Sequence, residues 1–174
     1  MPVETCAERT STSPTAQDAV WVQNGPGNQL YYPYVSSCVT ATLVFQNGLL
    51  GGHASQVTPD EKKPQLQPAQ NLQDVISRMI TAAPDAKTRG AFLKICFIGT
   101  TSSKDWDFGQ ATKAITKQFG QPKEDEPVEY NLSPVDAVFD TEHSVLSIVP
   151  REKKAEGADK TIRDAKKMFA TIDY

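Results

Sequence analysis

The 174-residue chain is poor in the side chains that most often bind metals or form crosslinks. It has two histidines and three cysteines, and no two cysteines form a C-x-x-C pair. Three widely separated cysteines predict neither a disulfide framework nor a zinc site, and reduced thiols fit a cytosolic environment. We therefore expect no metal and no organic cofactor.

Long apolar runs and an excess of positive charge are also lacking. No stretch approaches the roughly 18 apolar residues of a membrane span, and Met1–Cys6 has neither the basic start nor the apolar core of a signal peptide. The 18 Lys and Arg residues are outnumbered by 21 Asp and Glu residues, for a net charge of −3. This balance predicts no nucleic-acid partner. We expect a protein that is cytoplasmic, or secreted into a target-cell cytoplasm without a Sec signal peptide.

Length and composition predict one globular domain. The hydrophobic content of 39% suffices for a substantial core at this length. Residues 1–19 contain Thr, Ser and Pro and few apolar side chains, so we expect a flexible N-terminal tail in which Cys6 is an exposed thiol without a role. Residues 20–174 form the predicted domain.

Hydrophobic periodicity predicts an α+β fold, with antiparallel β-sheets in a sandwich-like core flanked by helices. Expected strands cover 20–23, 30–35, 38–46, 49–56, 91–99, 128–131, 135–139 and 145–149. One helix is expected from an Asn71 cap to a stop before Pro84, and a second from an Asp105 cap to Phe119. A third, amphipathic helix over 157–172 should pack on the sheet through the apolar residues Ala158, Ile162, Ala165, Phe169 and Ile172.

One pair of residues can carry out covalent chemistry. The cysteine lies in Ser36-Ser37-Cys38-Val39-Thr40, and the histidine lies 15 residues later in Gly51-Gly52-His53-Ala54-Ser55. A nearby imidazole is the usual means of converting a thiol into a nucleophilic thiolate, and it can later protonate the leaving group. Cys38 and His53 together predict acyl transfer.

A hairpin connects the two segments. Asn47-Gly48 is the strongest two-residue turn signal in the region, and such a turn would pair Gln46 with Leu49. Continuing that register places His53 opposite Thr42.

This register puts Cys38 and His53 on one face of the hairpin, because side chains alternate between faces with a period of two. Cys38 lies four residues from Thr42, which is roughly 13 Å along a strand. We therefore expect a bend at Gly51-Gly52 that brings the two side chains together.

Each member of the pair has a rival. Cys96 lies in an apolar strand, where burial raises a thiol pKa, and no histidine is near it in sequence. His143 falls in the turn between the two last strands. We rank Cys96 below Cys38 as the nucleophile and His143 below His53 as the base.

The same segments resemble a known enzyme family. Ser36-Ser37-Cys38-Val39-Thr40-Ala41 and Gly51-Gly52-His53-Ala54 resemble the nucleophile and base segments of the chemoreceptor glutamine deamidase CheD. Val138-Phe139-Asp140-Thr141-Glu142-His143-Ser144-Val145-Leu146 is similar to the hairpin that closes that fold, so the resemblance spans roughly residues 30–150. The 15-residue gap is similar to that of the cytotoxic necrotizing factor toxins, which share the fold.

The resemblance implies a CheD-like or necrotizing-factor-like fold, with Cys38 as nucleophile and His53 as base. CheD-like enzymes often carry a threonine that orients the histidine six positions before the cysteine, where this chain has Tyr32. Other members of the superfamily use a backbone carbonyl instead. CheD proteins also place two residues between the double glycine and the histidine, whereas His53 follows Gly52 directly.

The implied function is that of a cysteine-dependent protein glutamine deamidase, a hydrolase that converts a glutamine side chain of a target protein into glutamate through a thioester. The departures above and the added terminal helix favour a bacterial effector or toxin with a role in virulence over a housekeeping enzyme. An amine reaching the thioester first would give transglutamination. The alternatives are a non-enzymatic interaction domain on the same fold and a cysteine peptidase.

Overall fold

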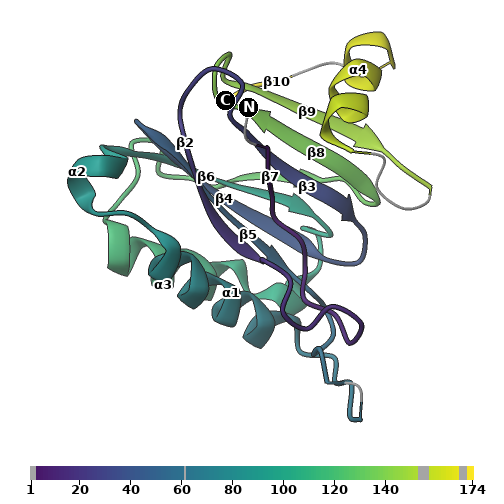
Figure 1. The fold of residues 1–174 in the computed structure, drawn as a ribbon. Coiled ribbons are helices and arrows are strands. Elements are labelled where there is room, and N and C mark those ends of the chain that lie inside the picture. The colour runs from purple at the N-terminus through teal and green to yellow at the C-terminus, as the bar shows by residue number, and fades with distance from the viewer. Residues whose placement is uncertain (1–2, 61, 153–156, 169–171) are drawn as a thin grey trace.

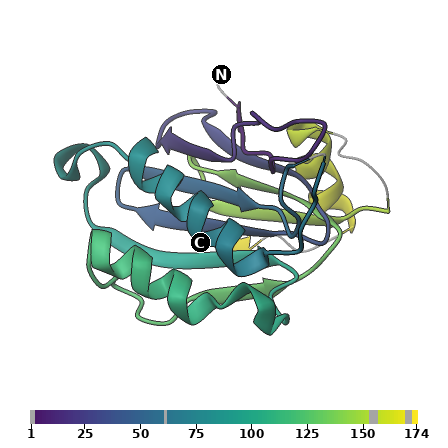
Figure 2. The same cartoon turned by 90° about the horizontal axis from the view of Figure 1, so that it is seen from below.

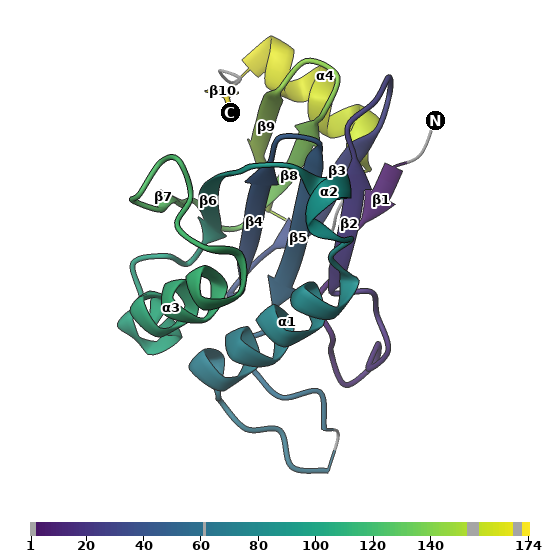
Figure 3. The same ribbon diagram turned by 90° about the vertical axis from the view of Figure 1, so that its left-hand side faces the viewer.

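The computed structural model describes residues 3–60, 62–152, 157–168 and 172–174. Two five-stranded sheets lie face to face, and helices cover the outer face of each, so that the described chain forms four layers (Figure 1). Figure 3 shows these layers from the side. The predicted α+β class is confirmed.

Both sheets are mixed. In chain order the strands are β1 (Val3–Thr5), β2 (Ala19–Gln23), β3 (Gln29–Val35), β4 (Val39–Phe45), β5 (Gly48–Ala54), β6 (Phe92–Gly99), β7 (Val128–Asn131), β8 (Val135–Asp140), β9 (Val145–Pro150) and β10 (Ile172–Asp173). The first sheet has the order β1-β3-β8-β9-β10 and the second β2-β5-β4-β6-β7. The sequence predicts antiparallel sheets, but β1 pairs with β3, and β6 with β7, in parallel. A helix connects β6 to β7, as a parallel crossover requires.

The helices are α1 (Pro68–Ala82), α2 (Ala86–Arg89), α3 (Phe108–Phe119) and α4 (Ala158–Met168). Figure 2 shows α1 and α3 side by side across the outer face of the second sheet. The first helix begins earlier than predicted, because Pro68 suits the first turn, and Asn71 instead donates its side-chain N–H to the Ser55 carbonyl at 2.8 Å. Asp107, not Asp105, caps α3. No helix among the described residues combines the length and apolar character needed to span a membrane.

The last helix packs on the first sheet as predicted but is shorter. Ala158 contacts Tyr31 and Val138 in a small core on the sheet's outer face. Phe169, which we placed in this helix, lies outside the described residues. Ile172 belongs to β10 and pairs with Leu146.

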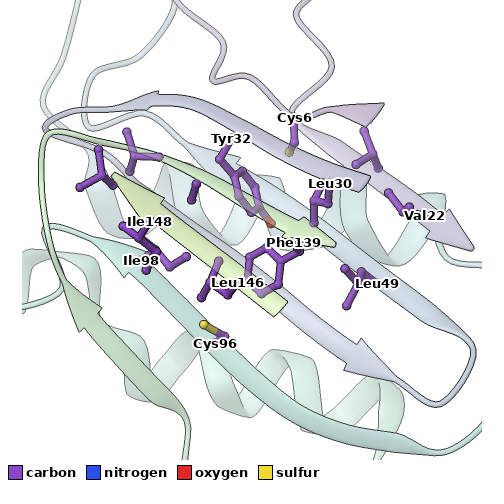
Figure 4. Close-up of a cluster of buried hydrophobic side chains, with 14 of the residues drawn as sticks. Cys6, Val22, Leu30, Tyr32, Leu49, Cys96, Ile98, Phe139, Leu146 and Ile148 are labelled. Atoms are coloured by element: carbon purple, nitrogen blue, oxygen red, sulfur yellow. The ribbon is translucent and has the colours of Figure 1, made fainter. Parts of the chain in front are cut away.

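Besides this small core, two larger apolar cores fill the space between the layers. The core between the sheets is shown in Figure 4 and contains Cys6, Val22, Leu30, Tyr32, Cys38, Leu49, Cys96, Ile98, Phe139, Leu146 and Ile148 among others. The core between the second sheet and its helices includes Leu43, Phe45, Leu50, Leu72, Ile76, Met79, Phe97, Trp106 and Ile115. Cys38 thus faces the inter-sheet core.

The N-terminal segment is built into the fold. The sequence predicts a flexible tail over 1–19, whereas the structure places Val3–Thr5 in the first sheet beside β3. Cys6 donates its backbone N–H to the Tyr31 carbonyl at 2.9 Å, and its side chain is fully buried. The prediction of an exposed Cys6 thiol is wrong, because backbone pairing holds a segment whose side chains are mostly polar.

Candidate active site

The β4–β5 hairpin has a different register from the predicted one. Residues 46–47 form the turn, and His53 lies opposite Thr40 rather than Thr42. The predicted register is therefore wrong by two residues, a shift that keeps every side chain on its expected face.

Gly48 explains the shift. It belongs to β5, where a Cβ atom would collide with the Val22 carbonyl oxygen and with the Trp21 ring of the neighbouring strand. The glycine therefore serves the close contact between β2 and β5, not the turn.

The corrected register makes Cys38 and His53 neighbours. Cys38 lies two residues before Thr40, so it is a diagonal neighbour of His53 across the hairpin, within reach of a long side chain. Its Sγ atom lies 3.0 Å from His53 Nε2. The pairing is continuous through Gly51–Gly52, so the bend predicted there is wrong. Ser37 has a positive φ of 55° immediately before Cys38.

The double glycine instead allows close packing on both faces of β5. A Cβ atom at Gly52 would lie 2.7 Å from Val75 Cγ1 of α1, and it would also collide with Met79. A Cβ atom at Gly51 would lie 2.7 Å from the Tyr32 hydroxyl. Val75, Met79 and Tyr32 therefore pack directly against the backbone that carries His53.

The His53 ring is held in one orientation. Its Nδ1 atom lies 2.9 Å from the Cys6 carbonyl oxygen, and its backbone N–H donates to the Asp18 carbonyl at 2.9 Å. A carbonyl can only accept, so Nδ1 carries the proton and Nε2 presents a lone pair. The Cys38 thiol is therefore the donor toward Nε2.

Tyr32 does not hydrogen-bond His53. Its hydroxyl lies 2.7 Å from Thr42 Oγ1 and donates to the Ala41 carbonyl at 3.2 Å. The two rings meet edge to face, with centroids 5.9 Å apart. The structure thus gives Tyr32 a packing contact with the histidine, and the orienting bond is made by the backbone carbonyl of Cys6.

Sequence reasoning missed one member of the site, Glu8. Its carboxyl group lies close to the side chains of Ser55 and Cys38, and burial raises its pKa. The ligand atoms of Glu8, Cys38 and His53 all lie within 4.8 Å of one another. No spacing or motif connects residue 8 to this hairpin, because the contact depends on how the N-terminal segment folds back over it.

Burial keeps the Cys38–His53 pair uncharged. It raises the pKa of the Cys38 thiol well above its usual range, and the negative charge of Glu8 raises it further. Backbone hydrogen bonds from Ser36 and from Cys38 itself oppose this rise. Burial also lowers the pKa of His53 to about 4. The resting pair is therefore a thiol and a neutral imidazole, not a thiolate and an imidazolium.

The site is closed to solvent. Cys38 is 0% and His53 1% exposed. A small cavity of about 100 Å³ lies next to it, lined by Ser55, Asp18 and Arg78 among others. Asp18 is buried, and its carboxylate accepts a 2.7 Å ion-pair bond from Arg78. A substrate must therefore displace part of the covering chain.

The rival residues lie elsewhere. Cys96 faces the inter-sheet core from β6, where burial raises its pKa to about 12. His143 is exposed in the β8–β9 turn and pairs with Asp140 at 2.8 Å. Neither joins the contact between Cys38 and His53.

Comparisons with protein-family models and with curated proteins found no match to this chain. The resemblance to the CheD-like and necrotizing-factor-like deamidases therefore stays a prediction. The contacts among Cys38, His53, Cys6 and Glu8 determine what chemistry the site can perform.

Proposed function

We propose that this protein is a cysteine-dependent protein glutamine deamidase. The observation that carries the proposal is the 3.0 Å contact between Cys38 Sγ and His53 Nε2, with the opposite ring nitrogen bonded to the Cys6 carbonyl. A nucleophile, a base and a group that orients the base are the three parts of a thiol acyl-transfer site. The resemblance of the same segments to the glutamine deamidases supports the substrate class.

The reaction follows from the protonation states. His53 Nε2 accepts the Cys38 proton as the sulfur attacks the carboxamide carbon of a glutamine side chain, and the carbonyl oxygen becomes an oxyanion. The C–N bond then breaks while His53 returns the proton to the departing nitrogen, so ammonia leaves and a thioester remains. Water hydrolyses the thioester to glutamate and restores the thiol. Because the resting pair is neutral, proton transfer accompanies attack.

Backbone N–H groups beside the sulfur are suited to stabilising the oxyanion. The backbone groups of Ser36 and Cys38 lie close enough to the sulfur to lower the pKa of the thiol. Fixed N–H donors near the attacking atom are the usual means of stabilising negative charge in acyl transfer. These two groups are our candidates for the oxyanion site.

The burial of the site favours a side-chain amide over a peptide bond. A peptidase needs an extended cleft for the substrate backbone on both sides of its nucleophile, whereas Cys38 and His53 are 0% and 1% exposed. A glutamine side chain ends in a small carboxamide on a flexible stem. We therefore place the cysteine peptidase below the deamidase, with a protein carrying a reactive glutamine as the substrate.

A second candidate function is a non-enzymatic interaction domain that keeps this fold. The observation in its favour is the complete burial of Cys38 together with its raised pKa, as in structural cysteines. Under this alternative the Cys38 side chain only fills space in the core, and its contact with His53 has no chemical role.

Mass spectrometry of lysate proteins incubated with the purified protein tests the proposal. Deamidation adds about 1 Da to particular glutamines and leaves the backbone intact. We expect Cys38→Ser and His53→Ala to lower the rate about a thousandfold or more, with folding checked by circular dichroism. The matched controls Cys96→Ser and His143→Ala should keep it. Full activity in Cys38→Ser, or no modified glutamine with the unaltered protein, would overturn the proposal.

A further inference from the structure

Glu8, Cys38 and His53 bring three different electron-pair donors to one point. A carboxylate from the N-terminal segment, a sulfur from the residue before β4 and an imidazole nitrogen from β5 converge, with their ligand atoms all within 4.8 Å of one another. The bond from Nδ1 to the Cys6 carbonyl leaves Nε2 with a lone pair. The single thiol proton can therefore form a hydrogen bond to either Nε2 or the carboxylate, but not to both. A metal cation can be coordinated by all three donors at once.

We propose that Glu8, Cys38 and His53 bind one Zn²⁺ ion. Cysteine sulfur, histidine nitrogen and carboxylate oxygen are the ligand types that proteins use for zinc, and three protein ligands leave the fourth tetrahedral position to water. The sulfur and nitrogen donors favour zinc over magnesium or calcium, which prefer oxygen ligands.

The geometry requires only a small adjustment. A tetrahedral zinc ion with bonds of about 2.3 Å to sulfur and 2.0 Å to nitrogen holds those two atoms about 3.5 Å apart. Cys38 Sγ and His53 Nε2 are 3.0 Å apart when the thiol hydrogen lies between them. Losing that hydrogen and separating the two atoms by about 0.5 Å opens the position for the metal, a distance that a small rotation of the cysteine side chain covers.

The groups that contact the proposed ligands are also typical of a metal site. Metal-bound histidines almost always donate their second ring N–H to a carboxylate, a backbone carbonyl or water, and His53 makes such a bond to Cys6 at 2.9 Å. The Ser55 side chain lies beside the Glu8 carboxyl group. Ser55 also lines the small cavity of about 100 Å³ next to the site.

A second cluster of potential ligands provides an internal comparison. Asp140, Glu142 and His143 also lie within reach of one another, but all are at least partly exposed, and the group has no thiol. His143 is already paired with Asp140. We therefore expect zinc to select the buried cluster that contains Cys38.

Zinc binding and the proposed deamidation exclude one another in a given molecule. The ion takes the sulfur lone pair that attacks the substrate and the Nε2 lone pair that accepts the proton. It also joins the N-terminal segment to the β4–β5 hairpin through Glu8, which should stabilise the fold in proportion to zinc occupancy. Because binding needs no substrate, this inference holds whether or not the protein is an enzyme.

Cobalt substitution is the experiment that tests the site. The purified full-length protein is stripped with a chelator and titrated with Co²⁺, followed by displacement with Zn²⁺. We expect one Co²⁺ per chain, with a thiolate-to-cobalt charge-transfer band in the near ultraviolet and tetrahedral d–d bands in the visible. The band should be lost in Cys38→Ser. Glu8→Gln and His53→Gln should weaken binding at least about tenfold.

Matched variants keep the test decisive. Glu142→Gln and His143→Gln alter the exposed cluster and should leave the affinity unchanged, while circular dichroism confirms that every variant is folded. Binding that survives Cys38→Ser, or that follows His143, would overturn the assignment. So would the absence of one-to-one binding to the unaltered protein at micromolar concentration. Deamidation is assayed separately in chelator, so the two proposals fail independently.

Discussion

Replacing Glu8 with glutamine should lower the pKa of the Cys38 thiol. Burial, the larger cause of the raised pKa, is unchanged by this substitution, which removes only the negative charge facing the sulfur. The side chain keeps its shape, while one of its two acceptor oxygens is replaced by an NH2 donor. Glu8 is ionised at the alkaline pH where the thiol titrates, so its charge opposes formation of the thiolate throughout.

The size of the effect follows from the separation of the two groups. Their ligand atoms lie within 4.8 Å of each other. Two unit charges at about 4.8 Å interact by about 3.5 kcal/mol at an effective dielectric constant of about 20. Glu8 is only partly buried, so water screens its charge, and we expect about 1.4 kcal/mol to be realised. That corresponds to a fall of about one in the pKa and about ten times more thiolate at a given pH.

The assay is a pH titration followed by NMR of the cysteine Cβ resonances in ¹³C-labelled protein, which distinguishes Cys38 from Cys6 and Cys96. It is carried out in chelator so that no metal holds the thiol. Glu129→Gln removes an exposed charge and is the matched control, which should leave the Cys38 titration unchanged. An unchanged or higher Cys38 pKa in Glu8→Gln would refute the electrostatic argument.

Two further predictions concern stability. Gly52→Ala forces a methyl group against Met79 and should destabilise the fold by about 1–3 kcal/mol in urea unfolding. Gly109→Ala is the control, because a Cβ atom added at Gly109 would have its nearest neighbour 3.7 Å away. This variant should be as stable as the unaltered protein or up to about 1 kcal/mol more stable. Equal losses of stability in the two variants would contradict the packing argument. Burial lowers the pKa of His53 from 6.5 to about 4, so between these values the unfolded chain binds a proton that the folded chain does not. Stability should therefore fall as the pH drops through this window, by up to about 3 kcal/mol. His53→Gln should remove this dependence while His143→Gln keeps it; identical acid sensitivity in all three proteins would count against a buried neutral His53.

Much of the fold can be predicted from hydrophobic periodicity. Leu72, Val75, Ile76 and Met79 recur at helical spacing and are buried together under the second sheet. The alternation along β4 and β5 identifies the face that Cys38 and His53 share, because a register error of two residues leaves the faces unchanged.

The register itself could not be predicted, because two requirements compete for one glycine. Asn47-Gly48 is an excellent local turn signal, but Gly48 is needed where β2 approaches β5. Tertiary contact outweighs the local turn preference, and only a structure reveals it. This two-residue shift is also what brings His53 within 3.0 Å of Cys38 without the expected bend.

The N-terminal contribution to the site has no sequence signal. Backbone pairing does not require apolar side chains, so a polar segment can enter a sheet without showing periodicity. Cys6 contributes a carbonyl oxygen, which every residue possesses. Glu8 contributes an ordinary carboxylate, 30 positions before the cysteine it contacts.

The N-terminal segment is fixed at both ends, on either side of the loop that carries Glu8. The backbone N–H of Cys6 is bonded to β3, and its carbonyl accepts a hydrogen bond from the His53 ring. The Asp18 carbonyl accepts the backbone N–H of His53, and the Asp18 carboxylate pairs with the Arg78 guanidinium. Residues 7–17, which include Glu8, form a loop that closes on itself, with Ala7 bonded to the carbonyl of residue 17. The two backbone carbonyls that hold His53 belong to Cys6 and Asp18, which lie on either side of this loop. The orientation of the imidazole therefore does not depend on the loop that carries Glu8.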